Sequence, residues 1–255
     1  MLDITVTQHK NHAKISPKTT TMSAFELNNQ AIRELKDGSF VAAVQTFQQA
    51  LHRMRDVLCR DCEAKGPASP VDSQCEQMQT EEADCIVVPT DASKDSSNTF
   101  SSRYENHFAM FDGAFRMPLS LTENDVLESA DVENFASSCL LYNLGLAYHK
   151  KGLIDGSSRQ LQQAMGLYKK SAILLEYLEE QEEHTMLLLL AIMNNMGHIY
   201  AEQYDIKEAG NCIDSLQYLL DTDECQLLLD EDHYNFFYWS FFLFPEKPVF
   251  FAAAA

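Results

Sequence analysis

The stretch LLYNLGLAYHKKG at residues 140–152 decides the fold. It places Leu141, Leu144, Gly145 and Tyr148 at spacings of three, one and three residues. In an α-helix, residues three and four apart share a face, so these four side chains form one stripe. Because glycine has no side chain, the stripe has a hole where a second helix can approach closely. The stretch therefore predicts a helix packed tightly against a neighbouring helix.

The same stripe occurs twice more in the chain. The later copy is Met193, Met196, Gly197 and Tyr200, and a weaker early copy is Leu27, Gln30, Ala31 and Glu34. Each copy is followed by a second helical pattern with a small residue and a bulky residue four positions later: Ala43 and Phe47, Ala164 and Tyr168, Ala209 and Ile213. Regular recurrence of a helical pair predicts a repeat architecture.

This pattern resembles the tetratricopeptide repeat (TPR), a pair of antiparallel helices. The resemblance implies an all-α fold in which helical hairpins stack as a short solenoid, and it covers rather under half of the chain. The layout, with its YNLGLAYH-like and NNMGHIY-like helices and aromatic C-terminus, is also similar to TPR-like proteins of diatom-type algae, which implies no activity. A long insert separates the first copy from the second, so the pattern leaves open whether the first pair stacks on the others.

Changes in composition divide the chain. The segment at 61–95 is acidic and rich in Pro, Ser and Thr, which is typical of disorder. The run HFAMFDGAFRM has apolar residues on both sides of Asp112-Gly113, a strong signal for a hairpin turn. We therefore expect a disordered tail at 1–22, a helical hairpin at 23–59, a disordered acidic insert at 60–103, a β hairpin at 104–120, TPR-like helical pairs at 121–222, an aromatic capping helix at 223–244 and a tail at 245–255.

The charge balance excludes some partners. The 38 acidic and 19 basic residues give a net charge of −19, which repels phosphate backbones and anionic membranes. We expect no nucleic acid or membrane partner and, if anything, a basic protein or peptide; the alternative is that the acidity only keeps the protein soluble. Seven cysteines and an N-terminus without a signal-peptide pattern favour a cytoplasmic or nuclear location.

Three asparagines occupy matching places, each two residues before the small residue of its stripe: Asn29, Asn143 and Asn195. TPR stacks present these helices on a concave groove that binds an extended peptide or a helix. A side-chain amide both donates and accepts, so such a ladder could pair with the backbone of an extended ligand. The alternative is that the asparagines only bridge neighbouring helices. The expected partner-binding residues are Asn29, Tyr142, Asn143, Leu146, His149, Asn194, Asn195 and His198.

Two features of this expected groove bear on its ligand. His149 and His198 either make the groove sensitive to pH or are ordinary polar wall residues. The TPR proteins that bind chaperone tails need Lys or Arg on the first and third groove helices. The matching positions here hold Asn28, Ile32, Ala191 and Asn195. Binding of a chaperone tail by that mechanism is therefore not expected.

Little in the sequence supports chemistry. Cys59 and Cys62 form a CxxC, but no second tight pair follows, as a zinc ribbon requires. No nucleotide-binding, metalloprotease or hydrolase motif occurs. We expect no catalytic residue, metal or cofactor, and a non-enzymatic protein-binding scaffold. The alternatives are a structural protein that self-assembles through its aromatic C-terminal helix and an enzyme or metal module at the CxxC.

Overall fold

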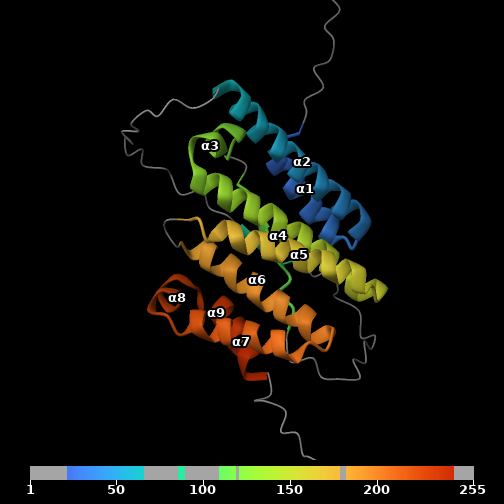
Figure 1. Cartoon of the computed structure of the whole chain (residues 1–255), viewed down its shortest axis with the longest axis vertical. Helices are drawn as coiled ribbons and strands as arrows, with labels where there is room; N and C mark the ends of the chain where they lie inside the picture. The colour runs from blue at the N-terminus through green and yellow to red at the C-terminus, as the bar shows by residue number, and fades with distance from the viewer. Residues whose placement is uncertain (1–21, 66–85, 90–108, 119–120, 179–181, 244–255) are drawn as a thin grey trace, which may run out of the picture.

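The computed structural model describes residues 22–65, 86–89, 109–118, 121–178 and 182–243, and these are mostly helical (Figure 1). The all-α prediction is confirmed. The helices are α1 Ala24–Lys36, α2 Phe40–Lys65, α3 Glu123–Glu128, α4 Ala130–Asp155, α5 Ser158–Leu175, α6 Glu183–Glu202, α7 Ile206–Leu220, α8 Asp223–Leu228 and α9 Glu231–Leu243. The strands are β1 Ile86–Pro89 and β2 Gly113–Arg116.

Local sequence sets the helix ends. At the start of α1, the Ser23 hydroxyl accepts from the Glu26 amide, and the Glu26 carboxylate accepts from the Ser23 amide. This reciprocal cap satisfies two amide groups that the first turn leaves without partners. Gly38, with φ of 73°, and Gly156, with φ of 61°, lie in the turns after α1 and α4. Glycine adopts this left-handed conformation without steric cost, so both turns are tight.

The helices form antiparallel pairs that stack in chain order. Helix α1 packs against α2, α4 against α5, and α6 against α7. The pairs are joined by contacts of α2 with α4 and of α5 with α6, and Figure 1 shows α2, α4, α5 and α6 side by side. The first pair therefore stacks on the later ones in spite of the long insert. Buried residues from all pairs form one continuous apolar core.

The predicted close approach at Gly145 is present. A Cβ atom at this position would lie 2.8 Å from Cε1 of Tyr168 on the paired helix α5. Tyr168 is fully buried, so its ring fills the space that the glycine leaves. On the same helix, Tyr148 accepts a hydrogen bond from Gln48 of α2 at 2.9 Å. The stripe that predicted the fold thus contacts both neighbours of α4.

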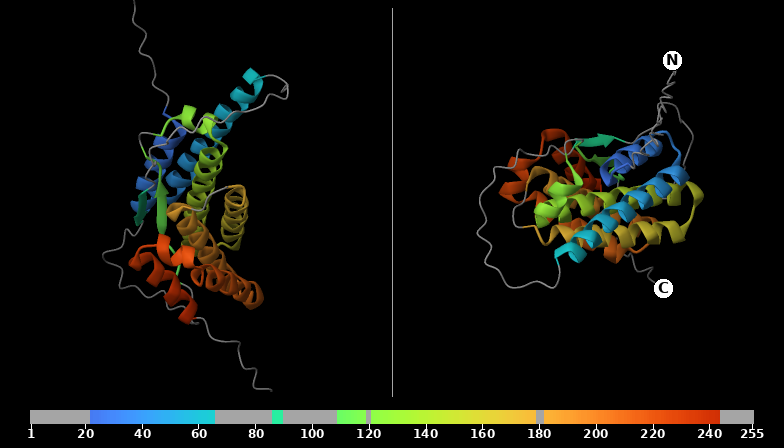
Figure 2. Two further views of the ribbon diagram at one scale, coloured as in Figure 1. Left: turned by 90° about the vertical axis from the view of Figure 1, so that its left-hand side faces the viewer. Right: turned by 90° about the horizontal axis from the view of Figure 1, so that it is seen from above.

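The β-hairpin prediction for 104–120 is wrong. Strand β2 pairs antiparallel with β1, with Ile86 opposite Arg116 and Pro89 opposite Gly113. A two-residue hairpin turn of the Asp-Gly type needs positive φ at both residues, and Gly113 has no positive φ. Both strands lie on one side of the helical stack (Figure 2). The segment stays extended because its backbone groups have partners far away in the sequence.

Two other boundaries differ from the prediction. Residues 60–65 continue α2 and residues 86–89 form β1, although both fall in the segment predicted to be disordered. The predicted capping helix at 223–244 is two helices, because Leu229 between them is extended and buried. Asp230 then accepts from the amide of His233 at 2.8 Å, and this bond caps the start of α9. Residues 1–21 of the predicted tail at 1–22, the predicted tail at 245–255 and the rest of the insert lie outside the described residues.

Candidate functional site

An extended segment of the chain, residues 109–117, lies along the helices that carry the three asparagines. We call it the strap. Its strand β2 contacts α1 and α4, and its first residues bind α6. The left view of Figure 2 shows β2 running beside the helical stack. The face predicted to bind an extended ligand is therefore covered by the protein's own chain.

Each of the three asparagines binds both backbone groups of one strap residue. Asn195 accepts from the amide of Phe111 and donates to its carbonyl, both at 2.9 Å. Asn143 does the same to Phe115, at 2.9 and 2.7 Å. Asn29 does the same to Met117, at 3.1 and 2.8 Å. The three asparagines therefore form a ladder along an extended segment of the chain itself.

The asparagine ladder fits the strap because the spacing of the asparagines matches the alternation of backbone groups along an extended strand. Successive residues of an extended strand point their backbone groups to opposite edges, so the odd-numbered residues 111, 115 and 117 present theirs to the same side. The asparagines come from corresponding positions of α1, α4 and α6. A carboxamide offers one acceptor and two donor hydrogens, which is the complement of a backbone residue. The three helices thus place one carboxamide beside each of these strap residues.

Further side chains complete the contact with the strap backbone. Asn28 donates to the carbonyl of Phe115 at 3.2 Å, and Asn194 donates to the carbonyl of Ala109 at 2.8 Å. The Tyr142 hydroxyl lies 3.2 Å from the carbonyl of Gly113, to which it donates. Burial raises the pKa of Tyr142 well above 10, so this hydroxyl keeps its proton. These helices therefore hydrogen-bond to the backbone of the strap. The sequence of the strap affects the contact through the packing and charge of its side chains.

Two aromatic side chains anchor the strap. The Phe115 ring is fully buried and meets the Tyr142 ring edge-on, with centroids 5.2 Å apart. The Phe111 ring packs against Phe236 and Phe237 of α9, with centroids 5.3 and 5.2 Å apart. Both arrangements are favourable geometries for aromatic pairs. The first anchor fixes the strap to the stack, and the second fixes α9 to the strap.

One charged contact is added between the anchors. The Lys150 ammonium of α4 lies 3.7 Å from a carboxylate oxygen of Asp112, and the two side chains are 11% and 28% exposed. Partial burial reduces screening of this pair by salt. The pair therefore contributes to the register of the strap on α4.

Behind the ladder, two histidines form part of a buried hydrogen-bond chain. Asn195 donates to the Tyr168 hydroxyl at 3.4 Å, and this hydroxyl lies 3.3 Å from Nδ1 of His149. Nε2 of His149 lies 3.1 Å from Nδ1 of His198. Since the hydroxyl accepts from Asn195 and keeps its own proton, it donates to His149, and His149 then donates to His198. This order assigns the proton to Nε2 of His149.

Burial disfavours charge on both imidazoles. Desolvation, together with the nearby His198 and Lys150, lowers the pKa of His149 well below 6.5. Desolvation lowers the pKa of His198 to about 4, although Glu202 acts in the opposite direction. Both rings are therefore neutral near pH 7. They lie between helices, His149 fully buried and His198 7% exposed, and they are not open groove walls.

The structure brings most of the predicted site residues together. Asn29, Tyr142, Asn143, Asn194 and Asn195 bind the strap. Leu146 is a fully buried core residue, and hydrogen bonds through Tyr168 and Asn195 connect the two histidines to the strap. Sequence reasoning missed the strap itself and the aromatic residues Phe236 and Phe237. The alternation of apolar residues from Ala109 to Met117 was the available signal, and it was interpreted as a hairpin.

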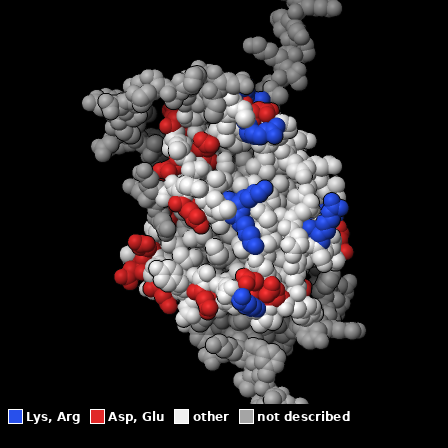
Figure 3. All heavy atoms as spheres, in the orientation of Figure 1, with Lys and Arg blue, Asp and Glu red and all other residues white. Residues whose placement is uncertain are grey.

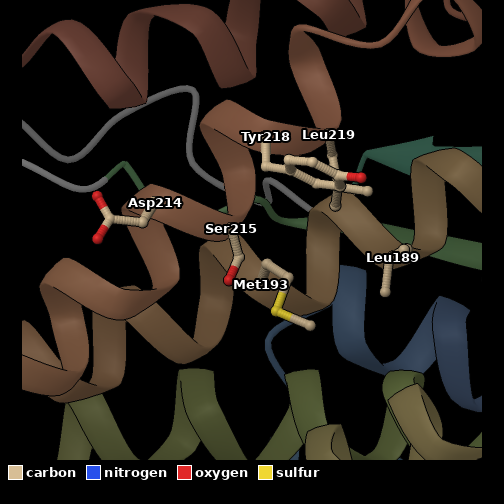
Figure 4. Close-up of a pocket in the computed structure, with 6 residues that line it drawn as sticks. All are labelled: Leu189, Met193, Asp214, Ser215, Tyr218 and Leu219. Carbon is tan, nitrogen blue, oxygen red and sulfur yellow. The ribbon is translucent and has the colours of Figure 1, made fainter.

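Other candidate sites are weaker. An open apolar hollow of about 390 Å³ lies between α6 and α7 (Figure 4), and it is lined by Leu189, Met193, Asp214, Ser215, Tyr218 and Leu219. Within the described part of the chain, no group of three or more His, Cys, Asp or Glu side chains is placed to hold a metal ion. Cys59 is exposed on α2. Figure 3 shows Lys and Arg side chains in separate small groups on the face it draws.

Comparisons with known proteins give no relative. No family model, no curated protein and no solved structure matches the chain. Among the helices that the structure describes, none is both long and apolar enough to cross a membrane.

Proposed function

We propose that the protein is a non-enzymatic binding scaffold built from TPR-like helical pairs, and that it recognises an extended polypeptide through the asparagine ladder. The observation that carries this proposal is the two-point binding of Phe111, Phe115 and Met117 by Asn195, Asn143 and Asn29. Such a ladder reads backbone, so it fits any extended segment with suitable side chains. The strap is an example that the chain itself supplies.

The test compares three forms of the full-length protein in quantitative affinity capture, followed by crosslinking of the recovered partners. Asn143→Ala removes the central rung. Asn211→Ala is the matched control, because Asn211 is an exposed asparagine of α7 whose side chain donates to Glu208 on the same helix. Circular dichroism first shows that each form is folded.

We expect partners that the wild type and Asn211→Ala retain and Asn143→Ala loses, with crosslinks on α1, α4 or α6. Equal recovery by all three forms, or crosslinks confined to other helices, would contradict the proposal. This readout does not depend on which residues the partner carries.

A second candidate function is self-assembly through the aromatic C-terminal helix. Trp239 is 60% exposed and Tyr238 38% exposed on α9, whereas Phe237 is fully buried. Exposed aromatic surface favours association with another protein surface. Sedimentation of the wild type and of Trp239→Ser distinguishes the candidates: a mass that rises with concentration in the wild type alone supports self-assembly, and a constant monomer mass excludes it.

A further inference from the structure

The strap occupies the face that the proposed function assigns to a ligand, so an external ligand would have to displace it. We infer that residues 109–117 are an intramolecular pseudo-ligand, and that the external ligand is an extended peptide with aromatic residues at positions i and i+4 and an acidic residue at i+1. This inference rests on the proposed function, because it names the partner class and the regulation of the same face.

The backbone contacts make the strap exchangeable. The hydrogen bonds from the ladder to the strap go to main-chain amides and carbonyls, at Phe111, Phe115 and Met117. An external peptide in the same conformation would make the same bonds, so replacing one segment by the other leaves no asparagine of the ladder without its backbone partner. Which of the two segments is bound therefore depends on their side chains and on their concentrations.

Side-chain contacts define which peptides compete well. The site around Phe236 and Phe237 takes one aromatic ring, and the site beside Tyr142 takes a second ring four residues later. These two rings, Phe111 and Phe115, are 6% and 0% exposed. Between them, Ala114 is also fully buried, so the connecting residues must be small.

Charge adds the third requirement. Lys150 lies on α4 beside Asp112, the residue directly after the first aromatic anchor. The Lys150 side chain is 11% exposed, so a peptide without a carboxylate at this place would lose an ion pair with a largely buried ammonium. The preferred motif is therefore aromatic, acidic, two small residues and aromatic.

Tethering gives the strap its advantage. A covalently linked segment binds at an effective concentration of the order of mM, so a free peptide of equal intrinsic affinity hardly competes. The affinity of an external ligand is reduced by the fraction of molecules in which the strap is displaced. Weakening the strap alone should therefore strengthen external binding, which is the opposite of what weakening the ladder does.

The experiment uses the full-length protein and a labelled, capped peptide AMFDGAFRM, which copies residues 109–117. Fluorescence anisotropy compares the wild type with F115A, which removes a strap anchor, and with F115A/N143A, which also removes a rung. We expect F115A to bind the peptide at least about 30-fold more tightly than the wild type, and the double variant to lose most of that gain. A peptide with both Phe replaced by Ala should not bind.

Two controls keep the test decisive. If F115A does not fold, D112K serves instead, because it repels Lys150 and keeps both aromatic anchors; we then expect about a 5-fold gain in affinity. A peptide with Lys in place of Asp should bind about 5-fold more weakly than AMFDGAFRM.

Two results would overturn the inference. A folded F115A, or D112K in its place, that binds the peptide no more tightly than the wild type shows that the strap does not compete. A concentration-dependent dimer of F115A that excludes the peptide assigns the face to a second copy of the chain. Either result leaves the proposed function standing if captured partners still crosslink to α1, α4 or α6.

Discussion

The buried histidine pair predicts a loss of stability at mildly acidic pH. His149 and His198 are hydrogen-bonded to each other at 3.1 Å, and burial lowers the pKa of both below the 6.5 of an exposed imidazole. The unfolded chain therefore binds more protons than the folded protein below about pH 6.5. The stability that these residues contribute is fully present above that pH and is lost as the pH falls toward their folded pKa values.

The pKa of His198 sets the magnitude. With an unfolded value of 6.5 and a folded value of about 4, His198 alone lowers the free energy of unfolding by about 2 kcal/mol between about pH 7.5 and about pH 5. His149 contributes in the same direction, because its pKa is also lowered. Its protonation at Nδ1 removes the acceptor of the Tyr168 hydroxyl, which is bonded to Asn195.

Urea unfolding at a series of pH values measures the effect. The double variant His149→Gln/His198→Gln should flatten the pH dependence by about 2 kcal/mol or more over this interval, whatever its absolute stability. His52→Gln is the matched control, because the His52 side chain is 62% exposed on α2, and it should keep the slope of the wild type. An unchanged slope in the double variant would refute the reasoning, as would proton titration by NMR that gives both buried histidines ordinary pKa values.

Three further predictions concern the ladder, the helix contact and the thiols. Asn143→Ala leaves the amide of Phe115 without its partner and should lower the free energy of unfolding by about 2–4 kcal/mol, measured in urea. Gly145→Ala places a methyl group against Tyr168 and should cost about 1–3 kcal/mol, whereas Gly166→Ala, with open space around it, should be neutral or stabilising; equal effects would contradict the packing argument. Among the cysteines with described side chains, a thiol reagent should label the exposed Cys59 long before the buried Cys139, Cys212 and Cys225. Burial also raises the thiol pKa of Cys212 to about 12 and that of Cys225 to about 11. Similar labelling rates for exposed and buried thiols would show that the helices open easily.

The sequence predicted the helical part of this fold well, because helical periodicity is a local signal. The stripe of Leu141, Leu144, Gly145 and Tyr148 and its later copy fall within α4 and α6. The chemistry of the three asparagines was also predictable, since a carboxamide repeated at one place of a helical repeat can pair with an extended backbone.

The occupant of the ladder was not predictable from local pattern. Asp112-Gly113 carries the signal of a tight turn, but the residues on either side bind asparagines 28 to 88 positions away. Long-range partners of this kind overrule local turn preference, and nothing near Asp112 in the sequence reports them. The strand partner β1 was missed for a related reason, since the composition around it is typical of disorder.

The order of contacts along the strap has a consequence for how the protein unfolds. A stack of helical repeats is coupled only between neighbours, so its ends can fray while its centre stays folded. Here a single strand binds Asn29 of the first pair, Asn143 of the second and Asn195 of the third. Separating one terminal pair therefore also breaks its bonds to the strap, which the other two pairs hold in place. The three pairs should therefore melt as one cooperative unit. Cleavage of a single peptide bond in the strap should restore independent melting of the pairs.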